Sequence, residues 1–336
     1  MRVSVFLSAQ FPPQQSAREG LAAVVEQAQL ADRLGFDAVF LGHHFLAHSA
    51  FLQPLELAGY LAHATERVRI GFGILLAPLF NPVALAEQLA TLDVLSGGRM
   101  IVGLGAGYRR RETEAFGVEW GDRIRRLREY VPLMRALWNG ETVDAEGSWG
   151  SVRGASLPLR CVQPGGPPIW IGAFAEPAIR RAARLDASWL IGPEGDDEAI
   201  AARLRLYRAT LAEHGHALER AYPMSREACV AATTEEARAL IRPHLEQQYA
   251  AYKSWDTAQQ VEVDSYLDEH CVVGDADRVV ARLQRLEREH GITDVALRVQ
   301  FMGMPHAQAL EQIRRFGEDV IPRVSAPATA GTTSTF

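Results

Sequence analysis

Short apolar runs alternate with longer amphipathic stretches along almost the whole chain. The apolar runs are the length of buried strands, and the amphipathic stretches have the spacing of helices with one buried face. The expected strands are Val3–Leu7, Ala38–Leu41, Arg69–Leu76, Met100–Leu104, Ile169–Gly172, Ser188–Ile191, Ser225–Ala231 and Asp294–Val299. The expected helices are Arg18–Leu34, Pro54–Ala64, Val83–Leu95, Asp122–Trp138, Pro177–Leu185, Asp197–Glu213, Glu235–Lys253, Ala276–Glu289 and His306–Asp319.

Eight strands, each followed by at least one helix, predict an α/β fold of the (β/α)₈ TIM-barrel type. We expect one barrel domain over residues 1–324 and a disordered Ala/Thr/Ser-rich tail over 325–336. The 336 residues exceed the ~250 typical of such a barrel. Two insertions account for the excess: a Gly/Pro-rich hairpin over Thr142–Pro167, after the fourth helix, and a polar segment over Ser254–Val273, between the seventh and eighth strands. Long segments of the second kind often act as lids.

Composition excludes several classes of function. The net charge of −6 is spread along the chain, so we expect no nucleic-acid partner. Three cysteines, Cys161, Cys229 and Cys271, lack the spacing of metal ligands, and we expect no metal site and a reduced, cytoplasmic setting. The strand-like start of the chain does not resemble a signal peptide, and no segment is apolar enough to span a membrane.

Two adjacent histidines, His43 and His44, directly follow the second predicted strand. They therefore lie at the carboxyl end of a barrel strand, where barrel enzymes carry their active sites. Imidazoles there can donate or accept protons near neutral pH. The alternative is a histidine pair packed in a loop and bonded to backbone carbonyls.

Glycines interrupt the third and fourth predicted strands, in Ile70–Leu75 and Ile101–Gly107. Glycine in a strand indicates a bulge or a flat ligand against the main chain, although simple side-chain packing also explains it. The spacing G-x-G-x-G over Gly103–Gly107 is not a dinucleotide fingerprint.

We interpret most charges of the following Arg109–Glu114 run as a solvated helix face, with Arg109 near enough to the rim to face an anion. After the fifth strand, Gly172–Glu176 opens a helix whose free N–H groups suit a phosphate.

These segments together resemble the luciferase-like flavin-dependent monooxygenases, the family of bacterial luciferase and alkanesulfonate monooxygenase. The resemblance covers residues 1–324 and rests on Leu34–Phe45, Ile70–Val83, Leu92–Arg99, Gly103–Tyr108, Phe116-Gly117, Arg123, Leu137–Glu141 and Pro167–Gly172. It implies a barrel that binds reduced FMN or the deazaflavin F420 at its carboxyl rim. The His-His-Phe motif is similar to the FMN branch, which implies catalytic roles for His43 and His44.

The resemblance also implies a non-proline cis peptide at Gly73–Ile74, behind the flavin ring. The implied cofactor-binding residues are Gly73, Ile74, Gly105, Ala106, Gly107, Arg109, Gly172, Ala173, Phe174, Ala175 and Glu176. Two positions depart from luciferase: Gly42 replaces an acidic residue, and Ala106 replaces the arginine that binds the flavin phosphate. Phosphate binding then depends on Arg109 or on the helix start at Ala173–Glu176.

By this resemblance, the chain is a monooxygenase that uses reduced FMN and O₂, through a C4a-hydroperoxide, to oxygenate a small lipophilic substrate. A separate flavin reductase supplies the reduced FMN, and the enzyme is a homodimer. The expected substrate pocket comprises Phe6, Phe45, Phe72 and Tyr108. The main alternative is an F420-dependent hydride-transfer enzyme; a non-catalytic flavin-binding barrel and a metal-dependent hydrolase are the other two.

Overall fold

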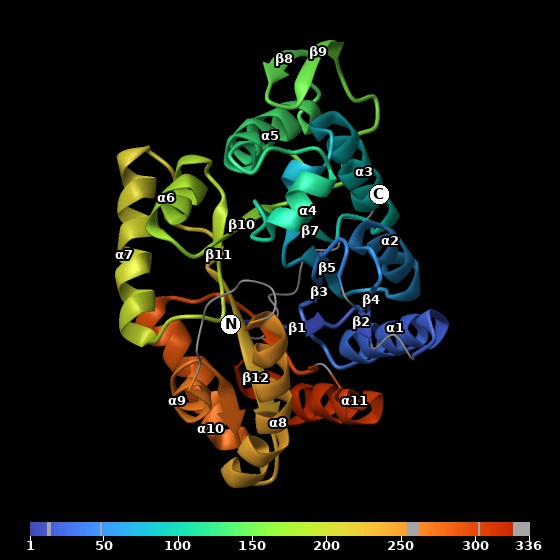
Figure 1. The fold of residues 1–336 in the computed structure, drawn as a ribbon. Coiled ribbons are helices and arrows are strands. Elements are labelled where there is room, and N and C mark those ends of the chain that lie inside the picture. Colours follow the sequence, from blue (N-terminus) through green and yellow to red (C-terminus); the bar gives the residue numbers. More distant parts are fainter. Residues whose placement is uncertain (12–14, 48, 254–261, 302, 325–336) are drawn as a thin grey trace, which may run out of the picture.

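The computed structural model describes residues 1–11, 15–47, 49–253, 262–301 and 303–324, and its eight long parallel strands close into a ring (Figure 1). Each strand pairs with the next in chain order, and the last pairs with the first. The ring consists of β1 (Arg2–Leu7), β3 (Ala38–Leu41), β5 (Arg69–Phe72), β7 (Met100–Gly105), β10 (Ile169–Ala173), β11 (Ser188–Ile191), β12 (Pro223–Val230) and β14 (Asp294–Arg298). The predicted (β/α)₈ barrel is confirmed.

Helices surround this ring on its outer side (Figure 1). They are α1 (Ala17–Arg33), α2 (Pro54–Ala64), α3 (Pro82–Leu95), α4 (Arg110–Ala115), α5 (Asp122–Trp138), α6 (Glu176–Arg184), α7 (Asp197–Glu213), α8 (Thr234–Lys253), α9 (Val263–Glu269), α10 (Ala276–Arg285), α11 (His306–Arg315) and α12 (Ile321–Val324). A 3₁₀ turn covers Ala77–Leu79, and π-helical turns at Leu286–His290 and Phe316–Val320 extend α10 and α11. Among the described residues, no helix combines the length and apolar character that crossing a membrane requires.

Local sequence signals explain where several helices begin. Ser16 and Glu19 form a reciprocal capping box at the start of α1. Asn81 accepts hydrogen bonds from two backbone N–H groups of α3, and Pro82 occupies its first turn. Asp196 and Asp275 each accept one backbone N–H group at the starts of α7 and α10. These caps fix the loops that leave the carboxyl ends of the strands.

The first predicted insertion is a hairpin, as expected: β8 (Val143–Gly147) pairs antiparallel with β9 (Gly150–Ala155). The second is described in part. Residues 254–261 lie outside the described residues, and Val263–Glu269 forms α9, which the sequence pattern did not predict. The Tyr266 hydroxyl of α9 donates to Glu227 Oε2 at 2.9 Å, which anchors the helix on β12. The role of this segment as a lid stays a prediction, and residues 325–336 lie outside the described part of the chain.

The third predicted strand, Arg69–Leu76, is not continuous. It ends at Phe72, and a separate short strand, β6 (Leu75–Leu76), pairs with β7. The peptide bond between Gly73 and Ile74 lies in the interruption and is cis, as the resemblance implies. Three other short strands, β2 (Gln10–Phe11), β4 (Ala50–Phe51) and β13 (Val272–Gly274), extend the rim; β2 pairs with β4, and β13 with β12.

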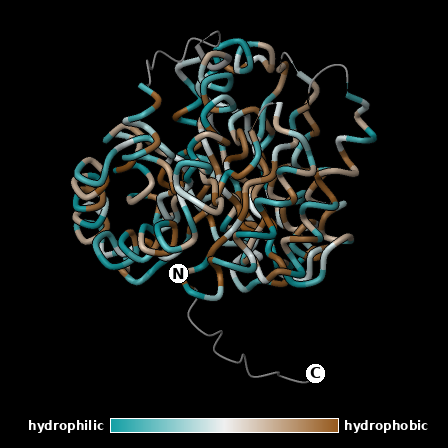
Figure 2. Tube along the Cα trace, turned by 90° about the horizontal axis from the view of Figure 1, so that it is seen from below, coloured by the Kyte–Doolittle hydropathy of each residue, from teal (hydrophilic) through white to brown (hydrophobic). Residues whose placement is uncertain are grey.

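The strands bury apolar side chains on both faces. Figure 2 shows hydrophobic segments concentrated in the middle of the molecule and hydrophilic ones along the outer helices. Inside the ring, Phe40 and Trp170 stack with their ring centroids 5.4 Å apart, beside Phe6 and Leu190. This packed interior closes the barrel, so a ligand can enter only at a rim.

Candidate active site

His43 lies at the carboxyl end of β3 and is 4% exposed. Its Nδ1 accepts a hydrogen bond from the backbone N–H of Leu76, at 3.1 Å. Because Nδ1 is an acceptor, a neutral ring must carry its proton on Nε2. The Nε2 atom is buried and has no hydrogen-bond partner among the described residues. The rim therefore contains a buried N–H donor whose ring is held in place through its other nitrogen.

Burial lowers the pKa of His43 to about 4, and the neighbouring charge of His44 acts in the same direction. The carboxylate of Glu112 and a weak hydrogen bond with the Gln53 side chain oppose this shift only in part. His43 is therefore neutral at pH 7, and its Nε2–H is a potential hydrogen-bond donor rather than a cationic group.

This pKa predicts a pH-dependent contribution to stability. Histidine in the unfolded chain titrates near ~6.5. Between that pH and about 4, the unfolded chain therefore binds one more proton than the folded chain. Neutral His43 contributes fully to the free energy of unfolding at pH values above its pKa in the unfolded chain. This contribution is lost as the pH falls through its pKa in the folded chain. Urea unfolding of the wild type and of His43→Gln should show a smaller difference at pH 5 than at pH 7; an equal difference would contradict the burial argument.

His44 is oriented by Glu112, a residue that the sequence analysis did not single out. Its Nδ1 lies 3.0 Å from Glu112 Oε1, and its Nε2 lies 3.5 Å from the Tyr108 hydroxyl. The same carboxylate oxygen accepts the backbone N–H of Phe45 at 3.0 Å and Nη1 of Arg109 at 2.8 Å. Glu112 thus supplies the acidic neighbour that Gly42 cannot provide.

The interpretation of the Arg109–Glu114 run as a solvated face is correct for Arg110, Arg111 and Glu114 but wrong for Glu112, which is 2% exposed. Arg109 is also buried, and its Nη1 donates to the carbonyl of Phe45 at 3.1 Å as well as to Glu112. The charges are buried because α4 packs against the loop that follows β3. Arg109 therefore anchors this loop, and its predicted contact with a phosphate stays a prediction.

Aromatic side chains surround His43. The Phe45 ring lies 4.5 Å from the imidazole and the Phe80 ring 5.9 Å, measured between centroids. Phe6 forms part of the barrel interior, and Tyr108 is half-exposed beside His44. The Phe72 side chain lies apart from these rings. It is fully buried in the hydrophobic core between the strands and the surrounding helices. Phe72 is therefore excluded from the predicted substrate pocket, and the roles of Phe6, Phe45 and Tyr108 as substrate contacts stay a prediction.

Ile74 provides an apolar surface inside the rim. A Cβ atom on Gly105 would lie 2.4 Å from Ile74 Cδ1, and one on Gly172 would lie 2.9 Å from Ile74 Cγ2. These two glycines therefore allow β7 and β10 to approach Ile74, which agrees with the packing explanation for strand glycines. Gly73 and Ile74 themselves are only partly buried. Contacts of Gly73, Ile74, Gly105, Ala106, Gly107 and Gly172 with a cofactor stay predictions.

The start of α6 carries the other predicted cofactor contacts: Ala173, Phe174, Ala175 and Glu176. The helix has no side-chain cap at Ala175. Three arginines gather beside α6: Arg123 and Arg128 of α5 both lower the pKa of Arg181, in the last turn of α6, after burial as the main cause. Arg128 and Arg181 form no ion pair with a described residue. Arg123 was expected only as part of a family motif, and no local sequence signal pointed to Arg128 or Arg181, because the packing of two helices brings the three together.

A group of possible metal ligands lies elsewhere, on the outer helices. It contains Asp197, Glu289 and His290. However, Arg282 donates two hydrogen bonds to the Asp197 carboxylate, at 2.7 and 2.8 Å, and Arg285 adds an ion pair at 2.9 Å. Arginine therefore already neutralises this carboxylate.

Comparison with known proteins identifies the family. The profile of the luciferase-like monooxygenases matches residues 1–294. This chain belongs to the luciferase-like monooxygenase family. A monooxygenase from Streptomyces bottropensis, RslO1, has a similar structure, with a TM-score of 0.88 and 26% identity over 97% of this chain and all of that one. Limonene 1,2-monooxygenase from Rhodococcus erythropolis is 28% identical over 80% of this chain and 72% of its own length.

The chain is also similar to F420-dependent enzymes. An F420-dependent glucose-6-phosphate dehydrogenase from Rhodococcus erythropolis is 39% identical over 49% of this chain. The match spans about half of that relative, 51% of its length. The luciferase-like chain described here is thus similar both to monooxygenases and to F420-dependent dehydrogenases.

Proposed function

We propose that this chain is a monooxygenase that uses reduced FMN and O₂ to oxygenate a small lipophilic substrate, with a separate flavin reductase as the source of reduced FMN. The observation that carries the proposal is the neutral, buried imidazole of His43, whose Nε2 forms no hydrogen bond of normal geometry with a described residue, although the Gln53 side chain lies close enough to raise its pKa. A buried donor without an acceptor costs free energy, so its retention at a rim favours a ligand oxygen as its partner.

The residues present fit a flavin. The partly buried Gly73–Ile74 segment offers an apolar surface for a planar ring, between the His43 side and the strands β7 and β10. Bound reduced FMN would supply the electrons that activate O₂. His43 would donate its Nε2 proton in a hydrogen bond to an oxygen atom held near the ring. Phe45 and Phe80 would limit the access of water to that donor.

The phosphate of FMN would bind between α5 and the start of α6. The uncapped N–H groups at the start of α6 favour an anion, and Arg181 in the last turn of the same helix adds a positive charge. Arg123 and Arg128 raise the local positive charge. An anion at this place would relieve the repulsion among the three arginines.

This phosphate site yields a direct prediction. Arg181→Gln should weaken FMN binding about tenfold, because it removes one charge-assisted hydrogen bond to the phosphate. Binding of riboflavin, which lacks the phosphate, should not change. Fluorescence titration with both flavins measures the effect, and Arg184→Gln, an exposed arginine of the same helix, serves as the control. Equal losses for FMN and riboflavin would place the phosphate elsewhere.

The second candidate function is F420-dependent hydride transfer, which the similarity to the Rhodococcus dehydrogenase favours. Titration of the protein with FMN, reduced FMN and F420, followed by measurement of O₂ consumption, separates the two. The monooxygenase proposal requires binding of reduced FMN and O₂-dependent turnover. Tight binding of F420 with turnover that is independent of O₂ would overturn it.

We also propose that the enzyme is a cytoplasmic homodimer joined through α2 and α3. These helices expose Tyr60, Val94 and Leu95, at 53%, 42% and 59%, and apolar side chains in such numbers on adjacent helices favour an interface.

The double variant Tyr60→Arg/Leu95→Arg should be monomeric, because it places two charges in a desolvated interface. Light scattering coupled to size-exclusion chromatography measures the mass. Leu218→Arg, which changes an exposed leucine outside these helices, should remain dimeric. A monomeric wild type would contradict the proposal.

A further inference from the structure

Gln53, the residue just before α2, lies next to the imidazole of His43. Its side-chain Nε2 donates a hydrogen bond to the backbone carbonyl of His44, at 3.1 Å. A carbonyl oxygen can only accept a hydrogen bond, so this contact fixes which end of the amide faces His44. The other end, Oε1, is buried and forms no hydrogen bond of normal geometry with a described residue. The amide of Gln53 is therefore held in one orientation, with its acceptor turned away from that carbonyl.

Two observations indicate that Oε1 of Gln53 faces the Nε2 atom of His43. The Gln53 side chain raises the pKa of His43, which is the effect of a hydrogen-bond acceptor near an imidazole. The Nδ1 atom of His43 is already engaged, because it accepts the N–H of Leu76 at 3.1 Å. The nitrogen that remains is Nε2, which carries the proton of the neutral ring and is also buried without a bond of normal geometry. A buried donor and a buried acceptor thus face each other.

The other groups around His43 leave this contact as the favoured one. The Phe45 and Phe80 rings lie 4.5 and 5.9 Å from the imidazole, measured between centroids, and offer no acceptor oxygen. The charged groups near it are His44 and Glu112, and these bond to each other through Nδ1 and Oε1. Burial without a hydrogen bond is unfavourable for a donor and for an acceptor, so a hydrogen bond between His43 and Gln53 stabilises both.

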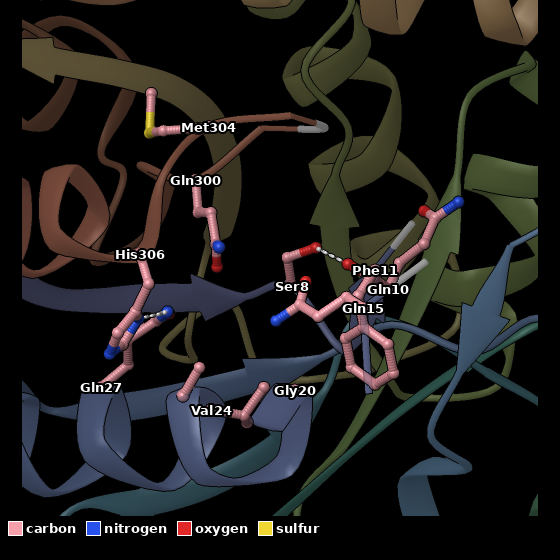
Figure 3. A pocket seen from close by; sticks show the side chains of 11 residues that line it. Ser8, Gln10, Phe11, Gln15, Gly20, Val24, Gln27, Gln300, Met304 and His306 are labelled. Atoms are coloured by element: carbon pink, nitrogen blue, oxygen red, sulfur yellow. Dashed lines mark hydrogen bonds between the residues drawn. The ribbon is translucent and has the colours of Figure 1, made fainter. Parts of the chain in front are cut away.

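A second histidine of the chain is also oriented by a glutamine amide (Figure 3). Gln27 Nε2, on α1, lies 3.1 Å from Nδ1 of His306, and the other ring nitrogen lies 2.9 Å from Glu26 Oε2. Both nitrogens of that ring are therefore engaged. At His43 the glutamine takes the other side of the ring, because a backbone N–H already faces Nδ1. The group at Nε2 is thus a carboxylate in one case and an uncharged amide in the other.

We propose that Gln53 is a positioning residue for His43: its Oε1 keeps the Nε2–H oriented until a ligand oxygen accepts that hydrogen in its place. Gln53 acts through the imidazole and not on the reacting atoms. An amide suits this role because it accepts a hydrogen bond without adding a charge, whereas a carboxylate would favour the cationic ring. The inference deepens the proposed function, and it rests on that function only for the identity of the ligand oxygen.

The pKa of His43 in the flavin-free protein tests this inference, measured by NMR of protein labelled with ¹⁵N-histidine. The His43 signals are those absent from His43→Gln. Gln53→Glu should raise the pKa of His43 by at least about one unit, because it places a carboxylate beside the ring. Gln53→Met, of similar length, should move the Nε2–H signal upfield, since the proton loses its acceptor. A merely structural role for Gln53 would change neither signal in a folded variant.

Gln29 supplies the matched control. Its Nε2 donates in the same way to a backbone carbonyl, that of Ala64 at 3.2 Å, but at the opposite end of α2. Gln29→Glu and Gln29→Met should therefore leave both His43 signals unchanged. Circular dichroism shows whether each variant is folded. A crystal structure of the wild type needs no variant and should show Gln53 Oε1 about 2.7–3.2 Å from His43 Nε2.

Turnover with reduced FMN gives a further measurement. Gln53→Met should lower the ratio of product to O₂ consumed about tenfold, because the donor remains but is no longer held in one direction. If the pKa and the crystal contact are as expected but no FMN-dependent turnover occurs, the proposed function fails and the role of Gln53 stands. An unchanged pKa of His43 in folded Gln53→Glu, or an amide oxygen directed away from Nε2 in the crystal, would overturn the inference.

Discussion

Replacing His43 with alanine should reduce formation of oxygenated product by about 10²–10⁴-fold, the usual contribution of a positioned proton donor. Affinity for FMN should change little, because the imidazole makes one contact near the reacting atoms and none with the phosphate site at α6. O₂ should still be consumed, and the missing product should appear as hydrogen peroxide. The measurement is the ratio of product to O₂ consumed, with a substrate found by screening lipophilic aldehydes and ketones.

Two further variants sharpen this test. His43→Gln retains an N–H donor in a similar position and should recover part of the coupling. His63→Ala removes an exposed histidine of α2 and should behave as the wild type. Full coupled turnover in His43→Ala would show that this imidazole is not the donor. A simultaneous loss of FMN binding would point to a structural role for the histidine, as a partner of the Leu76 backbone.

The barrel was predictable because its strands are short, apolar and separated by helical periods, a pattern that depends only on local sequence. The position of His43 followed from the same pattern, since the carboxyl ends of all strands meet at one rim. The interruption of the third strand was not visible in its apolar run, and the cis bond was predicted only through the family resemblance. The assignment of Phe72 to the pocket was wrong because the register of β5 turns that side chain toward the helices.

Charged residues were the least predictable part of the site. In the run Arg109–Glu114, buried and exposed charges alternate within one short helix, and no local signal separates them. Glu112 is buried because α4 packs against the loop after β3. The hydrogen bonds that join them link residues separated by 68 and 67 positions in the sequence. The arginine cluster near α6 has the same origin, since Arg123 and Arg181 approach each other only once the helices have packed. Long-range contacts of this kind place the groups that would hold a ligand.

The largest stability effect should follow from Glu112→Leu, a change of similar volume that removes the carboxylate. Arg109 would remain buried without the Glu112 carboxylate, and loss of one member of a buried ion pair typically lowers the free energy of unfolding by about 3–5 kcal/mol. The backbone N–H of Phe45 would lose its acceptor as well. Urea unfolding at pH 7 measures this loss. Glu114→Leu is the matched control, because its pair with Arg110 is exposed, and such pairs contribute at most about 1 kcal/mol.

A double variant separates the effect of Glu112 on stability from its effect on the orientation of the His44 ring. The double variant Glu112→Leu/Arg109→Leu removes both buried charges and should recover much of the lost stability, because no uncompensated charge remains. It should not recover coupled turnover, because His44 would still lack the carboxylate that orients its ring through Nδ1. If the double variant regains both stability and coupling, Glu112 serves only to neutralise Arg109, and the orientation of His44 does not depend on it.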